Sequence, residues 1–172
     1  MVEVGIRSVR PERDTAWARN LGITRQVSTF TTNFTPGQPR VVNIQTGARA
    51  LDGAVVEPGE VFSLNERLGP RTLAKGYVLA PQIGADLGYE DSVGGGVSQL
   101  STTLFNAVFF GGYQDVTHTV HALYIDRYPM GREGTLNYPS IDNRFRNDPP
   151  NGVLIRTSVS ATSVTVRPGS FK

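Results

Sequence analysis

The chain contains no cysteine in its 172 residues. This absence excludes disulfide bonds, thiolate metal sites and a cysteine nucleophile. Histidine is nearly absent as well, since only His118 and His121 occur. A metal site built on these two residues and Asp142 is disfavoured, because neither the H-x-E nor the H-x-x-x-H spacing occurs. We therefore expect no metal ion and no other cofactor.

The sequence also lacks long apolar runs and a strong charge of one sign. No stretch reaches the roughly 20 apolar residues of a membrane span, and Met1 leads into polar residues rather than into a secretory signal. The formal net charge is only +2, which argues against nucleic acid as a partner. We expect either a cytosolic chain or a fragment of a longer exported protein, with any membrane contact made through an anchor absent from this chain.

What is present favours one α+β domain. Apolar residues at helical spacing predict helices over residues 40–51 and 97–110, and a Pro and a Gly bound a short helix over 11–21. Alternating or β-branched stretches predict strands, which are residues 27–34, 54–62, 76–91, 116–129, 134–140 and a closing hairpin over 153–167. The predicted fold is a mostly antiparallel sheet packed against a central helix, at about 97–110, and two further helices.

The stretch SVGGGVSQLSTTLFNAVFFGG, residues 92–112, is the first candidate for a site. Three glycines precede the central helix, whose first turn offers free backbone N–H groups and the positive end of the helix dipole. Ser98 in that turn is a candidate nucleophile, His121 a candidate base and Asp142 the residue that orients it. The order nucleophile, histidine, carboxylate is that of papain-like and transglutaminase-like enzymes.

Two non-catalytic interpretations stay open for the same stretch. In the first, the glycines let the helix start flush against the sheet, and the serines and threonines are caps or packing hydroxyls. In the second, the loop and helix start hold an anionic group, with an arginine on the rigid GPRT turn as a clamp. A salt bridge from that arginine to Glu60 or Glu66 is the alternative. The ligand-binding residues predicted in this way are Arg71, Gly94, Gly95, Gly96, Gln99, Ser101 and Thr102.

The order and spacing of several blocks resemble the VanW family, named from accessory genes of B-type vancomycin resistance clusters. The resemblance covers residues 21 to 168. It rests on these blocks: FTTNF, NIQTGARALDGAVVEPGEVFSLNERLGPRT, KGY, GGGVSQLSTTLFNAVFFGG, HALYIDRYPMGREGTLNYPSIDNRFRND and VLIRTSVSATSVTVR.

The resemblance implies an exported or membrane-anchored protein of the cell envelope. Residues 1–20 would then be the tail of a preceding module or a linker, residues 21–168 the VanW-like domain and residues 169–172 a C-terminal tail. Many relatives carry Cys where this chain has Ser98. The serine is a switched nucleophile, a sign of lost activity, an engineered replacement, or one of several small residues that serve equally. The resemblance matches the family's histidine to His121, and the matching acid is Asp142 or Glu133.

The function expected from the sequence is binding of peptidoglycan or its stem peptide by an extracytoplasmic domain. The alternative is acyl transfer or amide hydrolysis on the same peptides, with Ser98 as nucleophile, His121 as base and backbone N–H groups of residues 96–99 as the oxyanion hole. A structural scaffold in an envelope complex is the third expectation. The enzyme hypothesis requires the Ser98 hydroxyl within hydrogen-bond reach of His121.

Overall fold

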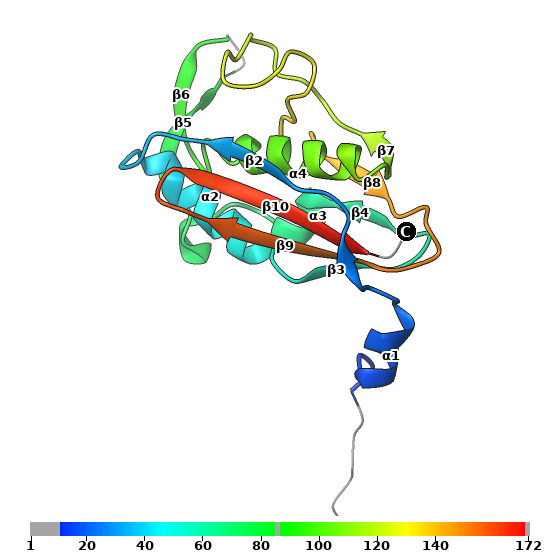
Figure 1. The fold of residues 1–172 in the computed structure, drawn as a ribbon. Coiled ribbons are helices and arrows are strands. Elements are labelled where there is room, and N and C mark those ends of the chain that lie inside the picture. The colour runs from blue at the N-terminus through cyan, green and yellow to red at the C-terminus, as the bar shows by residue number, and fades with distance from the viewer. Residues whose placement is uncertain (1–10, 85–86, 171–172) are drawn as a thin grey trace, which may run out of the picture.

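The computed structural model describes residues 11–84 and 87–170, and the predicted α+β fold with antiparallel sheets is confirmed. Figure 1 shows the sheet of β2, β10 and β9 lying across α2 and α4. The elements, in order, are α1 (Thr15–Asn20), β1 (Arg25–Gln26), β2 (Phe30–Asn33), α2 (Pro39–Leu51), β3 (Ala54–Val56), β4 (Val61–Ser63), α3 (Leu64–Leu68), the 3-10 turn η1 (Leu73–Lys75), β5 (Leu79–Ile83), β6 (Tyr89–Val93), α4 (Ser98–Phe110), β7 (Gln114–Thr117), β8 (Arg144–Arg146), β9 (Val153–Val159) and β10 (Ser163–Ser170).

The strands form three antiparallel groups in the described residues. The largest sheet has the order β1-β10-β9-β3, and β2 also pairs with β10. The predicted closing hairpin is confirmed as β9 and β10. Since β10 pairs with β1 at Gly169 and Ser170, the sheet includes the first two residues of the segment that the sequence assigns to a C-terminal tail. Residues 171 and 172, like residues 1–10 of the N-terminal segment, lie outside the described part.

The predicted central helix is α4, which begins at Ser98 and ends at Phe110. Every residue from Gln99 to Val108 is buried. Its apolar side faces β10 and β2, and the irregular segment 118–143 covers the other side. No helix in the described residues is long and apolar enough to cross a membrane. A helix covered on both sides needs partners for its polar residues as well as for its apolar ones.

One hydrophobic core joins the helices to the largest sheet. Its fully buried side chains come from α2, α3, α4, β8 and the two central strands, and they supply most of the stabilisation through removal of apolar area from water. They include Ile44, Leu51, Leu64, Leu100, Leu104, Phe145, Ile155, Val164 and Val166.

Two strands predicted after α4 are wrong. The predicted strand over 116–129 overlaps β7, Gln114–Thr117, by only two residues. The chain from 118 to 143 is irregular apart from one bridge between Asn137 and Ile141. This segment is tied to side chains of α4 rather than to another strand, as described below. The helix predicted over 11–21 is also shorter, because the Asp14 carboxylate accepts the N–H of Trp17 and starts the helix at Thr15.

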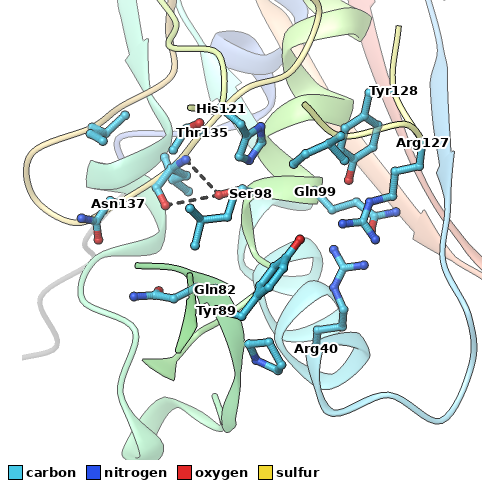
Figure 2. A pocket seen from close by; sticks show the side chains of 16 residues that line it. Arg40, Gln82, Tyr89, Ser98, Gln99, His121, Arg127, Tyr128, Thr135 and Asn137 are labelled. Atoms are coloured by element: carbon cyan, nitrogen blue, oxygen red, sulfur yellow. Dashed lines mark hydrogen bonds between the residues drawn. The ribbon is translucent and has the colours of Figure 1, made fainter. Parts of the chain in front are cut away.

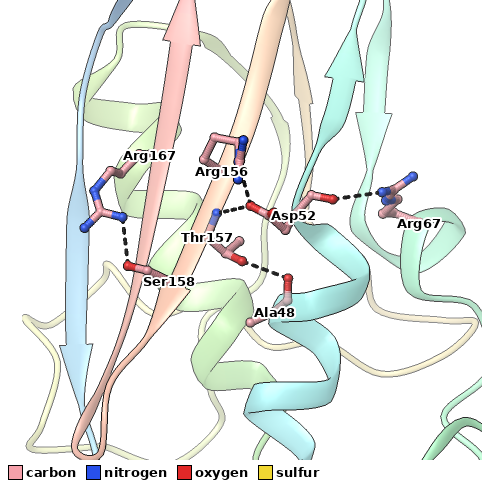
Figure 3. A network of polar contacts seen from close by, with 7 residues as sticks. All are labelled: Ala48, Asp52, Arg67, Arg156, Thr157, Ser158 and Arg167. Atoms are coloured by element: carbon pink, nitrogen blue, oxygen red, sulfur yellow. Dashed lines mark hydrogen bonds and ion pairs between the residues drawn. The ribbon is translucent and has the colours of Figure 1, made fainter.

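Asp52 joins the end of α2 to strand β9 (Figure 3). Its carboxylate accepts hydrogen bonds from Arg156 Nε (2.9 Å) and from the N–H of Thr157 (2.7 Å). Its backbone carbonyl accepts from Arg67. Burial alone would raise the pKa of Asp52, but these hydrogen bonds and the charge of Arg156 outweigh it and lower the pKa. The folded state therefore prefers the carboxylate.

We expect Asp52→Asn to lower the free energy of unfolding by about 1–2 kcal/mol at pH 7. The neutral amide oxygen accepts weaker hydrogen bonds from Arg156 and Thr157 than the carboxylate does. Because the folded pKa is the lower one, the contribution of the carboxylate is complete above the unfolded pKa of about 4 and disappears as the pH falls through the folded pKa. Urea denaturation at pH 7 and pH 3 measures this, with the exposed Asp126→Asn as control. An equal difference at both pH values would contradict it.

Candidate ligand-binding site

A cavity of about 170 Å³ lies where the starts of α2 and α4, the hairpin β5–β6 and the segment 118–143 meet (Figure 2). Ser98, His121 and Gln99 line it, together with Arg40 and Arg127. Among the described residues, no aspartate or glutamate does so. The cavity brings together residues that are far apart in the sequence.

The glycine run before α4 permits a close crossing of chain segments. A Cβ atom on Gly95 would lie 1.9 Å from a carbonyl oxygen of β5. Gly94 and Gly96 have φ values of 94° and 85°, where L side chains are strained, and Cβ atoms there would lie 2.7 Å from Arg71 Cβ and 2.6 Å from Arg40 Cβ. The run therefore allows two arginines to lie against the start of α4.

Arg40 and Arg127 give the cavity its charge. Both interact with the hydroxyl of Tyr128, and their guanidinium groups lie near one another in Figure 2. Burial lowers the pKa of Arg40, and the charge of Arg127 lowers it further. Burial also raises the pKa of Tyr128, which keeps the phenol neutral. No ion pair to a carboxylate is found for either arginine within the described ranges, so two positive charges face the cavity with neutral partners.

His121 lies in the irregular segment 118–143, not on the strand predicted for it. Burial lowers the pKa of His121, and Arg127 adds to this effect, while the buried carboxylate of Glu133 opposes it. The imidazole is therefore neutral at pH 7. The carboxylate whose charge raises the pKa of His121 is that of Glu133, the second of the two acids that the family resemblance suggested.

Three buried polar atoms on the wall of the cavity have no hydrogen-bond partner among the described residues. They are Gln99 Oε1, His121 Nδ1 and Thr135 Oγ1. Gln99 is 1% exposed, and its amide nitrogen is held by Thr32 Oγ1 and the Asn33 carbonyl. The Gln99 oxygen is therefore fixed in position with its acceptor capacity unused. Buried polar atoms without partners are rare and point to a missing partner.

The hydroxyl of Ser98 is bonded to the backbone of Leu136. It accepts the N–H of Leu136 at 3.1 Å and reaches the carbonyl of the same residue at 3.5 Å. The dashed lines in Figure 2 show both contacts. No hydrogen bond between Ser98 and His121 is present in the part of the chain described, although both residues line the same cavity. The geometry that the enzyme hypothesis requires is not formed.

Ser98 is the first of three polar residues on one face of α4 that hold the segment 132–136. Thr102 Oγ1 accepts the N–H of Gly134 (2.9 Å), and Asn106 Nδ2 donates to the carbonyl of Arg132 (2.8 Å). Four helical residues advance about 6 Å, and two extended residues advance about 6.6 Å. The i, i+4, i+8 spacing on the helix therefore matches alternate residues of the extended segment, which explains the polar motif without a ligand.

Two further predicted site residues are structural. Asp142 accepts from Ser63 Oγ (2.6 Å) and from the N–H of Asn65 (2.9 Å) at the start of α3. It makes no contact with His121 in the described residues, so the predicted triad is not assembled. Ser101 is fully buried, and its carbonyl and hydroxyl accept from Asn143 Nδ2 at 2.9 and 3.1 Å. Neither Ser101 nor Thr102 lines the cavity.

Arg71 lines an adjoining cavity of about 230 Å³ rather than the first one. Its guanidinium donates to the Gly69 carbonyl (2.8 Å) and to Asn65 Oδ1 (2.6 Å), and it lies 5.7 Å from the ring centre of Tyr138. The salt bridge considered from the sequence, to Glu60 or Glu66, is not found among the described residues. Burial lowers the pKa of Arg71, and the nearby Tyr77 and Asp142 offset this only in part.

Residues 39–168 match the family described as VanW like protein. The chain belongs to the VanW family. A curated relative, the uncharacterized protein YoaR of Bacillus subtilis (strain 168), is 36% identical over 156 residues, which are 90% of this chain and 51% of the relative. The chain thus spans about half the length of this curated relative. No solved structure matches it significantly.

Sequence reasoning on this VanW domain did not find Arg40 and Arg127. One signal was available for Arg40, which directly follows the Pro39 that starts α2. The first turn of a helix is the positive end of its dipole and favours acidic residues, so an arginine there is a locally unfavourable choice. Such choices mark candidate functional positions. Arg127 carries no comparable signal, because only the folding of segment 118–143 brings it to the cavity. No group of three metal-ligating side chains occurs among the described residues.

Proposed function

We propose that this VanW domain acts at the cell envelope and binds the carboxylate end of a peptide, with the stem peptide of peptidoglycan as the ligand. The observation that carries the proposal is the pair Arg40 and Arg127 in a cavity that no described carboxylate lines. Guanidinium groups bind carboxylates with two parallel hydrogen bonds. The positive ends of α2 and α4 add to the same field.

The unpaired polar atoms support a peptide over a simple inorganic anion. Gln99 Oε1 can only accept a hydrogen bond, and His121 Nδ1 and Thr135 Oγ1 can accept one too. A peptide offers amide N–H donors next to its carboxylate, whereas phosphate at neutral pH offers mainly acceptors. The volume of about 170 Å³ is below the range of roughly 300–1,000 Å³ for drug-sized ligands. It suits the last residues of a peptide, not a whole glycan strand.

The test is calorimetric titration with a synthetic stem peptide ending in D-alanine, as the free acid and as the C-terminal amide. The wild type is expected to bind the acid, and the amide at least about tenfold more weakly. Arg127→Gln is expected to weaken binding of the acid by roughly 30-fold or more, because a desolvated charge pair is lost. The exposed Arg144→Gln removes the same charge outside the cavity and serves as control.

Equal binding of acid and amide, or equal loss in both arginine variants, would rule out the carboxylate site. Absence of binding by the wild type would do the same.

Acyl transfer or amide hydrolysis is a second candidate function. It is supported by the placement of Ser98 and His121 on one cavity, with Glu133 acting on His121. The engagement of the Ser98 hydroxyl with Leu136 counts against it, since a nucleophile must be free to attack. In the same titration, mass spectrometry of the recovered peptide separates the two candidates. Binding predicts an unchanged peptide, and catalysis predicts cleavage that Ser98→Ala abolishes.

A further inference from the structure

The cavity with Arg71 and the cavity with Arg40 and Arg127 adjoin one another, and we call the two together the groove and each of them a lobe. They share five wall residues, which are Gln82, Gly96, Ser98, Leu136 and Asn137. The contact of Ser98 with Leu136 therefore lies between a cation on one side and two cations on the other. A ligand that occupied both lobes would therefore pass this contact.

The second lobe has the same electrostatic character as the first. Among the described residues no carboxylate lines it. Arg71 uses two of its donors on the neutral Gly69 carbonyl and Asn65 amide, and its Nε donor has no partner among the described residues. Asp142 lies close enough to Arg71 for its negative charge to raise the pKa of the guanidinium. However, the Asp142 oxygens are engaged by Ser63, Asn65 and Asn143.

The glycine run makes room for Arg71 in this position. Gly94 has no side chain, and a Cβ atom there would lie 2.7 Å from Arg71 Cβ and 2.8 Å from Arg71 Cγ. The guanidinium of Arg71 lies over the ring of Tyr138. The same run, at Gly96, makes room for Arg40. One short loop thus holds a cation in each lobe, on either side of the start of α4.

We propose that the groove takes a ligand with two negative groups, one held by Arg40 and Arg127 and the other by Arg71 in the adjoining lobe. The ligand class is an extended peptide whose terminal carboxylate is accompanied by a second carboxylate a few residues away. This inference rests on the proposed function and names its substrate class more narrowly. It makes Arg71 a residue of specificity for the second carboxylate.

The experiment uses acetylated tetrapeptides with a free C-terminal carboxylate and a glutamate one, two or three residues before it. The matched monoacid peptides carry glutamine at the same place. The readout is the ratio of the two dissociation constants, measured by calorimetry. We expect the wild type to bind the diacid about tenfold or more tightly than the monoacid at one spacing only, because the lobes have a fixed separation. In Arg71→Gln that ratio is expected to fall to about 1.

Arg67→Gln is the matched control, because Arg67 donates to the carbonyls of Ala50 and Asp52 outside both lobes. It is expected to keep the diacid preference. Arg71→Lys retains a cation and is expected to keep part of the diacid preference. This result would separate loss of the charge from loss of the fold. An unchanged preference in Arg71→Gln, or no preference in a wild type that still binds the monoacid through Arg127, overturns the inference and leaves the proposed function intact. A wild type that binds neither peptide overturns both.

Discussion

Gly95→Ala is expected to lower the free energy of unfolding by about 4 kcal/mol or more, and the melting temperature by at least roughly 10 °C. The new Cβ atom would lie 1.9 Å from the carbonyl oxygen of Ala80 and 2.6 Å from its carbonyl carbon. These are backbone atoms of β5, so no change of rotamer relieves the overlap. The loop before α4 has to move away from β5, and the Asn43 side chain then loses its hydrogen bond to the Gly95 carbonyl.

Gly53→Ala is the control for this effect. Gly53 has a φ of 75°, but no atom lies within 4 Å of the place of its Cβ. The substitution is expected to cost only the backbone strain of about 1–2 kcal/mol. Thermal unfolding followed by circular dichroism compares the two variants. If Gly95→Ala melts within a few degrees of the wild type, the close crossing of the loop and β5 described above is incorrect.

Arg40→Met is expected to have opposite effects on binding and on stability. Binding of the carboxylate peptide should weaken by roughly 100-fold, because one of the two guanidinium groups in the cavity is lost. Without ligand, the variant should be more stable by about 1 kcal/mol. The reason is that Arg40 is held near Arg127, in the first turn of α2, without a described carboxylate partner. Methionine keeps the apolar stem that lies against Gly96.

Melting temperatures with and without the peptide measure both effects in one experiment. The wild type is expected to gain stability with rising peptide concentration, as any ligand of the native state causes, and the variant to gain almost none. A variant that is destabilised without ligand and still responds to the peptide would show that Arg40 serves packing instead of binding. Such costs in stability at binding positions are common in proteins.

Local patterns in the sequence predicted the elements whose partners are close or regular. The apolar spacing in residues 40–51 and 97–110 predicts α2 and α4, and the alternation in 153–167 predicts the hairpin of β9 and β10. Each of these patterns reflects burial of one face against a single core. The glycines at 94–96 were also recognised as a place of close approach. Their neighbours, Arg71, Arg40 and the backbone of β5, were not.

The alternation in residues 116–129 predicts a strand, but only its first two residues lie in one, β7. Alternation shows only that every second residue prefers burial, and it does not name the partner that supplies the backbone hydrogen bonds. The second predicted strand, over residues 134–140, begins in a segment held by a helix face, through Ser98, Thr102 and Asn106. The polar residues of α4 were therefore interpreted as site residues, whereas most of them hold the chain that covers the helix.

The sequence by itself determined the family, the α+β class and the two main helices. The family follows from the order and spacing of motif blocks, and the fold class and helices follow from composition and short-range periodicity. Only the tertiary structure decided which charged groups meet, because Arg40, Arg71 and Arg127 approach α4 from three separate segments. It also bound Asp142 to Ser63, away from His121, and brought Glu133 close enough to act on His121 through its charge. The charge of a cavity depends on residues that are far apart in the sequence, so no local sequence pattern predicts it.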